Sequence, residues 1–256
     1  MPTEASGVES PHACKQYAIY DFMKRNSDDV IIVDEVMKVY KTRKIEYTAI
    51  RNISLTVKTG EFVSVLGPSG SGKTTLMNLL GTLDRPTHGK IFIDGVDTST
   101  LNERELAILR NRKIGFVFQS YNLVPYLTAF ENVSLPLMVD GIDTSENLKR
   151  GKDLLSEVGL EGKMHKKPNE LSGGEQQRVA IVRALINSPP IILADEPTGN
   201  LDSKTSDAVM SVLVRMAKEN NVTIVMVTHE EDIAAYSDRS VYLKDGVVER
   251  EKRLKK

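Results

Sequence analysis

Two glycine-rich turns, each at the start of a predicted helix, constrain this chain more than any other feature. The first is the phosphate-binding loop Gly67-Pro68-Ser69-Gly70-Ser71-Gly72-Lys73-Thr74, and the second is Leu171-Ser172-Gly173-Gly174-Glu175-Gln176. One such loop is enough to bind a nucleotide, so a second glycine turn is redundant unless it also meets a phosphate. Because one molecule cannot easily bring both turns to one nucleotide, we expect two molecules to share it.

Length and composition place the chain among ordinary globular proteins. It has 256 residues, of which 40% are hydrophobic and 27% charged, and its net charge of -1 favours no nucleic-acid partner. The single cysteine, Cys14, excludes an internal disulfide. No apolar stretch reaches the ~20 residues of a membrane-spanning helix, and residues 1–29 lack a signal-peptide pattern. We therefore expect any membrane that the protein serves to be crossed by other chains.

Apolar periodicity and turn residues predict the individual elements. Strands are predicted at 31–33, 53–57, 61–66, 90–93, 114–118, 191–194, 222–227 and 240–243, and helices at 74–80, 101–110, 175–186 and 203–218. Gly81 is expected to end the first of these helices, and Asp94-Gly95 to form a hairpin turn. Thr128 and Glu131 are spaced as a helix capping box.

This order of elements indicates an α/β fold. Strands alternate with helices around the motifs, which predicts a P-loop NTPase core with a parallel sheet and helices on both faces. The early strands indicate a peripheral antiparallel β-subdomain, and residues 120–178 an inserted α-helical subdomain. Residues 30–250 form the predicted domain, preceded by an extension at 1–29 and followed by a basic tail at 251–256. Within the extension, Lys15 to Arg25 is either a short helix or loosely ordered chain.

The phosphate loop has the chemistry that ATP requires. Its glycines let successive backbone N–H groups converge on the phosphates, and the following helix adds the positive end of its dipole. Lys73 places a charge between the β- and γ-phosphates, and the Thr74 hydroxyl can coordinate Mg²⁺. Thr75 is expected to contact the α-phosphate side. The loop follows a predicted strand and opens a helix, so ATP binding is favoured over a chance match.

Two acidic residues and a glutamine each stand at the end of a predicted strand. Asp195 can hold Mg²⁺, and Glu196 can orient and deprotonate the attacking water, because ligands bind at the carboxyl ends of parallel strands. The alternative is a solvated acidic pair. Gln119 can touch Mg²⁺ through its carbonyl oxygen, and a surface glutamine is an equally good interpretation of that residue alone.

The second glycine turn has the pattern of a capped helix start. Ser172 and Glu175 are spaced as a capping box for the helix predicted at 175–186. That helix start is an anion site with no nearby anion in its own molecule. The alternative is an ordinary cap, but the full run Leu-Ser-Gly-Gly-Glu-Gln is less likely by chance than the phosphate loop.

Together these motifs resemble the ATP-binding subunits of ABC transporters, along about residues 31–250. The resemblance implies that Ser172, Gly173, Gly174 and Glu175 lie across the γ-phosphate of the opposite subunit. It also implies that Asp202 belongs to a loop that contacts the partner.

Two further roles follow from the resemblance alone. His229 would hold the γ-phosphate and the attacking water, and Tyr40 would stack on adenine. Without the family, His229 is a surface histidine at a strand end and Tyr40 a half-buried strand aromatic. Glu196 is present where degenerate members have lost it, so hydrolysis is expected. Asn200 departs from the family, in which small residues are common at that position.

The resemblance implies an ATPase that uses ATP and Mg²⁺ and dimerises head to tail. A separate transmembrane permease would hold it at the cytoplasmic face of the membrane. Residues 127–133 and 135–137 look most like the lipoprotein-releasing and macrolide-exporter branch, which implies export or extraction of a substrate. The alternative is a mechanical regulator that signals through membrane proteins without transport. Four apolar residues of the insertion either line a groove for the partner or form its core: Leu123, Val124, Tyr126 and Phe130.

Overall fold

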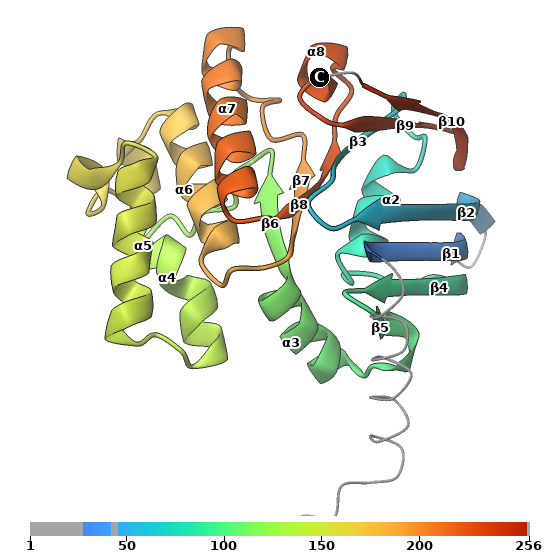
Figure 1. Cartoon of the computed structure of the whole chain (residues 1–256), viewed down its shortest axis with the longest axis horizontal. Helices are drawn as coiled ribbons and strands as arrows, with labels where there is room; N and C mark the ends of the chain where they lie inside the picture. The colour runs from blue at the N-terminus through green and yellow to red at the C-terminus, as the bar shows by residue number, and fades with distance from the viewer. Residues whose placement is uncertain (1–27, 42–45, 255–256) are drawn as a thin grey trace, which may run out of the picture.

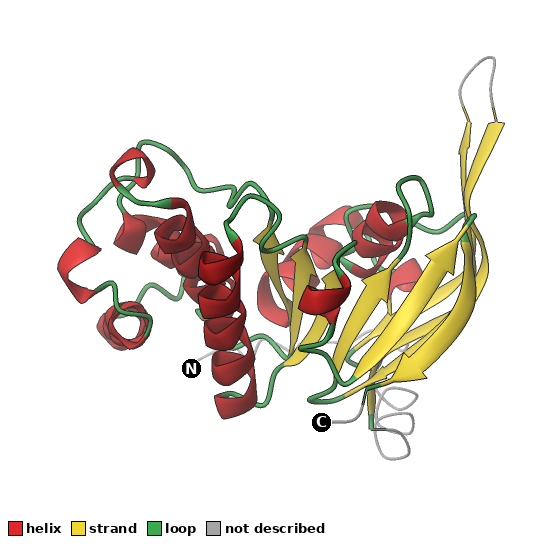
Figure 2. Cartoon of the chain, turned by 90° about the horizontal axis from the view of Figure 1, so that it is seen from above, coloured by secondary structure: helices red, strands yellow, loops and turns green. Residues whose placement is uncertain are grey.

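Two β-sheets and a helical region make up the molecule (Figures 1 and 2). The computed structural model describes residues 28–41 and 46–254. Lys15–Arg25, for which the sequence allows either a short helix or loosely ordered chain, lies outside the described residues. Strands gather toward one end of the view in Figure 2 and helices toward the other.

A six-stranded sheet forms the centre, in the order β10-β9-β3-β8-β7-β6. The pairs among β9, β3, β8, β7 and β6 are parallel, and β10 adds antiparallel to β9. Its strands are β3 (Phe62–Leu66), β6 (Ile114–Phe118), β7 (Ile191–Asp195), β8 (Thr223–Val227), β9 (Arg239–Lys244) and β10 (Val247–Arg253). Five of them fall where the sequence predicts strands within about one residue: β3, β6, β7, β8 and β9.

A four-stranded antiparallel sheet, ordered β2-β1-β4-β5, packs beside it. It comprises β1 (Asp29–Lys41), β2 (Glu46–Lys58), β4 (His88–Ile93) and β5 (Val96–Asp97). β4 and β5 join through Asp94 and Gly95, both at positive φ, as the predicted hairpin requires. The α/β fold class, with its parallel core and antiparallel β-subdomain, is thus confirmed.

Alternate residues of the parallel strands face two different cores. Ile191 and Leu193 of β7 pack with helix α2 (Lys73–Leu80) and the antiparallel sheet. Ile192 and Ala194, on the other face, pack with the helical region. Strands buried on both faces show continuous apolar runs, which is why the sequence identified them. Helices α2 and α6 (Gly173–Leu185) consequently lie on opposite sides of this sheet (Figure 1).

The helical region surrounds α6. It contains α4 (Ala129–Asp140), α5 (Ser145–Glu157), two 3-10 turns (Glu161–Lys163 and Pro168–Glu170) and α7 (Ser203–Glu219). The capping box predicted at Thr128 and Glu131 is present at the start of α4. Helix α3 (Glu103–Lys113) begins two residues later than predicted, because Asn102 and Glu105 form a capping box there. The short helix α8 (Glu231–Ala234) follows β8.

The segment predicted as a basic tail differs in the structure. Residues Glu251 to Arg253 belong to β10, and Arg253 pairs with Arg239 of β9. Charged residues alternate along this exposed strand, so it lacks the apolar face by which strands are detected in sequence. The prediction also covered only part of β1 and β2, which are 13 residues each and bury Val36, Ala49 and Ile50 outside the predicted ranges.

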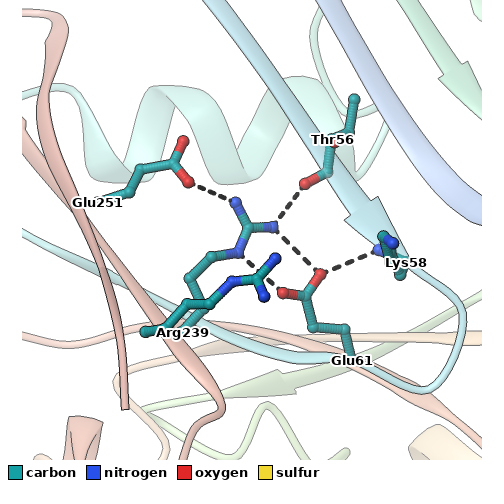
Figure 3. A pocket seen from close by; sticks show the side chains of 6 residues that line it. Thr56, Lys58, Glu61, Arg239 and Glu251 are labelled. Atoms are coloured by element: carbon teal, nitrogen blue, oxygen red, sulfur yellow. Dashed lines mark hydrogen bonds and ion pairs between the residues drawn. The ribbon is translucent and has the colours of Figure 1, made fainter.

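Arg239 ties the two sheets together at the strand ends remote from the phosphate loop (Figure 3). Its Nε donates to Glu61 Oε1 at 2.8 Å, its Nη1 to Glu251 Oε2 at 2.7 Å, and its Nη2 to the Thr56 carbonyl of β2 at 2.6 Å. These partners stand before β3, on β10 and on β2. The Arg239 side chain is only 12% exposed, and hydrogen-bonded partners offset the cost of burying its charge.

Candidate active site

The strand order brings four sequence motifs to one edge of the sheet. Val65 of β3 and Asp195 of β7 both pair with Val227 of β8, and Asp195 also pairs with Phe118 of β6. The phosphate loop, His229, Glu196 and Gln119 directly follow these strands. Their carboxyl ends therefore meet, where open parallel sheets bind ligands.

A cavity of about 580 Å³ lies at this edge. Residues from the phosphate loop, the end of β7, the end of β8 and the start of β2 line it: Ser69, Gly70, Gly72, Lys73, Thr74, Thr75, Glu196, His229 and Tyr47. The structure thus brings together most of the predicted binding residues with both predicted catalytic residues. Tyr47 is an addition.

The phosphate loop leaves the start of α2 without a side-chain cap. Gly72 is the N-cap, at φ 102°, and a Cβ there would lie 2.7 Å from the Ala49 carbonyl oxygen. Only glycine fits this position. Lys73 folds back so that Nζ donates to the carbonyl oxygens of Gly67 at 2.7 Å and Pro68 at 3.0 Å. The free amides of α2 and the ammonium group favour a phosphate.

Glu196 and His229 face each other at the mouth of this loop. Glu196 Oε1 lies 2.9 Å from His229 Nδ1. Glu196 has a φ of 44°, rare for a residue other than glycine, and its N–H donates to the Val227 carbonyl at 2.9 Å. Strained backbone of this kind clusters at functional sites. The arrangement holds a carboxylate and an imidazole beside the phosphate loop, as general-base chemistry requires.

Asp195 carries a partly buried carboxylate. Burial raises its pKa above the ordinary value and the neighbouring Glu196 adds to this, while Lys73 opposes it. A divalent cation beside this carboxylate would offset the repulsion.

The oxygen donors fit Mg²⁺. The described ranges contain no cluster of three or more His, Cys, Asp or Glu residues that could hold a metal alone. Mg²⁺ is commonly held by one or two carboxylates together with substrate phosphates and waters. The predicted donors, Thr74, Gln119 and Asp195, are of this oxygen type, so the site suits Mg²⁺ bound with ATP.

Gln119 is held by a reciprocal pair with Asn200. Gln119 Nε2 donates to Asn200 Oδ1 at 3.2 Å, and Asn200 Nδ2 donates to the Gln119 carbonyl at 3.0 Å. Because Gln119 donates through its nitrogen, its side-chain oxygen is the atom that can face a cation. Asn200 therefore has a hydrogen-bond partner in this chain.

Tyr40, expected to stack on adenine, does not line the cavity. Its hydroxyl donates to Asp84 Oδ2 at 2.9 Å, and Lys38 Nζ lies 4.8 Å from its ring centroid. Burial and the bond to Asp84 raise the pKa of the Tyr40 hydroxyl. The aromatic side chain at the cavity is Tyr47, whose hydroxyl donates to the Gly70 carbonyl at 3.4 Å. Stacking by Tyr40 stays a prediction.

At the second glycine turn, side chains of the turn itself cap the start of helix α6. Ser172 Oγ accepts from the Glu175 N–H, and Glu175 Oε2 accepts from the Ser172 N–H at 2.9 Å, which confirms the predicted capping box. Lys163 lowers the pKa of the Glu175 carboxyl, and the Ser172 N–H adds to this. A Cβ on Gly174 would lie 2.5 Å from Thr205 Cγ2, so any larger residue there would require the Thr205 side chain to move.

The residues predicted to act on an opposite subunit stand away from the cavity. None of Ser172 to Glu175 or Asp202 is among the residues that line it. Ser172 is exposed, and Asp202 caps α7 by accepting from the Thr205 N–H at 3.0 Å. Within one chain the two glycine turns therefore do not form a single site, as the sequence predicts.

Comparison with known proteins decides the family. The model of the ABC transporter family matches residues 50–199, more than half of the chain. The chain belongs to this family. It is an ABC ATPase, the ATP-binding subunit of a transporter.

Several relatives match over most of the chain. An ABC transporter ATP-binding protein of Methanocaldococcus jannaschii is 50% identical over 88% of this chain and 98% of its own. The lipoprotein-releasing system ATP-binding protein LolD of Aquifex aeolicus is 51% identical over 84% and 96%. The macrolide export ATP-binding/permease protein MacB of Syntrophobacter fumaroxidans is 49% identical over 87% of this chain and 32% of that longer protein.

Solved structures match as well. A dimeric structure of the M. jannaschii cassette superposes with a TM-score of 0.81 at 50% identity, covering 88% of this chain and 99% of that one. A second dimeric structure, a post-hydrolysis state bound to ADP and Pi, has a TM-score of 0.80 at 49% identity, with the same coverage.

Proposed function

We propose that this ATPase forms a head-to-tail homodimer around two Mg-ATP molecules and drives a separate transmembrane partner. One observation carries the proposal: the second glycine turn is a capped, exposed helix start that faces no phosphate site of its own chain. The ATP bound to a second copy of the chain would supply a phosphate for this helix start. The dimeric structures of the cassette at 49–50% identity support a dimer.

Each ATP would be held from two sides. Lys73 and His229 of one subunit would contact the γ-phosphate, and Ser172 and Gly174 of the other would cover it. Glu196 would orient the attacking water and accept its proton. Mg²⁺, held by Thr74, Gln119 and Asp195, would neutralise part of the phosphate charge. Hydrolysis would break the bridge between subunits and let them separate.

A groove of about 450 Å³ between α3, β6, α4 and α6 offers a surface for the transmembrane partner. Leu83, Phe116, Phe118 and Val139 are among its lining residues, and Val139 is 77% exposed. Apolar surface of this kind is suited to an amphipathic helix. In the described part of the chain no helix has the length and apolar composition needed to span a bilayer.

This groove is not formed by the four apolar residues that the sequence offers as a possible groove for the partner. Leu123 and Phe130 pack against the helical core, so for them the alternative interpretation holds. Val124 and Tyr126 are 38% and 83% exposed, but neither lines the groove.

The transported substrate is proposed from relatives alone. Lipoprotein release and macrolide export are named for relatives at 51% and 49% identity, and we propose extraction or export, with the subunit held by its permease at the cytoplasmic face of the membrane. A membrane chain recovered in a mild-detergent pull-down distinguishes a transporter from a regulator that signals without transport.

Size-exclusion chromatography of Glu196→Gln tests the dimer. This variant should elute as a dimer at saturating ATP and as a monomer without it, because ATP stays bound but is not consumed. Glu196→Gln combined with Ser172→Asp is the matched control, since Asp keeps the helix cap but repels a phosphate. It should stay monomeric. A monomeric Glu196→Gln at saturating ATP contradicts the proposal.

A further inference from the structure

A buried glutamine on α6 reaches the backbone that carries the active-site carboxylate. Gln177 is 0% exposed. Its Nε2 donates to the Pro197 carbonyl at 2.6 Å and approaches the Phe118 carbonyl at 3.4 Å. Pro197 follows Glu196, and Phe118 precedes Gln119. One side chain therefore contacts the backbone next to the predicted base, Glu196, and next to a predicted Mg²⁺ ligand, Gln119.

The Glu196 turn needs such support. Glu196 sits in the left-handed region at φ 44°, which costs of order 1–3 kcal/mol unless its surroundings fix it. On its N-terminal side the N–H of Glu196 is tied to Val227 of β8. On its C-terminal side the Glu196 carbonyl accepts from the Gly199 N–H at 3.1 Å, and because proline has no N–H, the Pro197 carbonyl is the backbone group that follows. Gln177 holds it.

Gln177 is costly to bury, which argues against a role in packing alone. Its Oε1 is buried and, within the described residues, has no hydrogen-bond partner. An apolar side chain of similar size would avoid that desolvation cost. Instead, residue 177 is a glutamine whose amide nitrogen donates to the Pro197 carbonyl.

We propose that Gln177 is a positioning residue that fixes the Glu196–Pro197 turn from helix α6. The same helix begins with the second glycine turn at Ser172, five residues earlier, so Gln177 also links that turn to the carboxylate of its own subunit. The proposal deepens the proposed function and rests on it. In the head-to-tail dimer, α6 of one subunit would contact the partner's ATP. Gln177 would then couple the position of that α6 to Glu196 of the same subunit.

Gln177→Met tests this, because it keeps an unbranched side chain and removes the donor. We expect turnover to fall about tenfold or more, since small displacements of a catalytic group are costly, with the affinity for a fluorescent ATP analogue unchanged. Asn132→Leu is the matched control: Asn132 is also 0% exposed and donates to backbone carbonyls, but on α4. It should lower the melting temperature without lowering turnover measured well below it.

Epistasis identifies the group through which Gln177 acts. In a Glu196→Gln background, Gln177→Met should lower turnover no further, because the positioned carboxylate is already gone. Losses that multiply would overturn the proposal, as would normal turnover in Gln177→Met. A Glu196→Gln protein with unchanged turnover would instead refute Glu196 as the base, and the Gln177 proposal with it.

Gln177→Glu is a second test variant that is expected to fold, since glutamate has nearly the same volume and shape as glutamine. When protonated, its carboxyl can donate one hydrogen bond to the Pro197 carbonyl, and when ionised it cannot. Its turnover relative to the wild type should therefore rise as the pH falls. A ratio that does not change with pH would count against the hydrogen bond to Pro197.

Discussion

The two glycine turns both open a helix, but their helix starts are completed differently. At the phosphate loop, Gly72 is the N-cap and no side chain caps α2. At the second turn, Ser172 and Glu175 cap α6 reciprocally, and Lys163 pairs with Glu175 at 2.5 Å. The first start leaves amides for an anion, whereas at the second the N–H groups of Ser172 and Glu175 are already bonded within the single chain.

This difference suits two kinds of phosphate contact: one that each chain can make alone, and one that needs a second copy. The phosphate loop lies with Glu196 and His229 around one cavity, so it can bind ATP in the monomer. The second turn is capped without a ligand, and in the proposed dimer it would engage a partner's ATP and release it again. The following predictions test this contrast.

Glu196→Gln should have the largest effect. Turnover is expected to fall by ~10²-fold or more, as for the loss of a general base. ATP affinity should be unchanged, since the phosphate loop is intact. Steady-state phosphate release and equilibrium binding of a fluorescent analogue measure the two quantities. A fall in affinity as large as the fall in turnover would place Glu196 in binding rather than in chemistry.

Lys73→Ala should weaken ATP binding to the monomer by about tenfold or more, the range for a charge-assisted hydrogen bond. Ser172→Asp should leave monomer binding unchanged, because Ser172 does not line the cavity. Calorimetric titration below the dimerisation concentration measures both. If both variants weakened ATP binding to the monomer equally, the two glycine turns would not differ in their contribution to the monomer's ATP site.

Ser172→Ala should lower the free energy of unfolding by about 1 kcal/mol, the usual cost of losing an N-cap. Ser172→Asp should restore most of that stability while staying inactive. Urea denaturation in the absence of nucleotide is the measurement. If alanine costs nothing, the second turn is not completed by its own cap.

Glu175→Gln should have the smallest effect, because glutamine keeps the capping box and loses only the charge. The folded pKa of Glu175 is lowered, so the charge stabilises the fold above its ordinary pKa and that gain is lost as the pH falls through the lowered value. Solvent screening limits the difference to about 0.5 kcal/mol. Denaturation from about pH 7 down to about pH 3 should show wild type and variant converging. A difference that grows toward low pH would have the wrong sign.

The sequence predicted the motifs and the parallel strands well because both have local signatures. Apolar runs such as Ile191 to Ala194 mark strands buried on two faces, and the phosphate loop has fixed spacing. Strand order has no local signature. Only the pairing of β7 between β6 and β8 placed Gln119, Glu196 and His229 at one edge.

Other features were missed for identifiable reasons. Tyr47 stands in the exposed start of β2, upstream of the apolar stretch that marked the strand. Gln177 did have a signal: it lies four residues before Ile181 and seven before Ala184, so the helical period puts it on the buried face of α6. A polar residue on an apolar face calls for a hydrogen-bond partner, but sequence alone does not identify Pro197.

Mixing two inactive variants tests the shared site most directly. Glu196→Gln carries an intact second turn, and Ser172→Asp carries an intact phosphate loop and carboxylate. A mixed dimer has one site in which both contributions are normal, so an equimolar mixture combined before ATP is added should recover up to about a quarter of wild-type turnover. If each chain instead completes its own site, the mixture will show no more activity than the two variants measured separately.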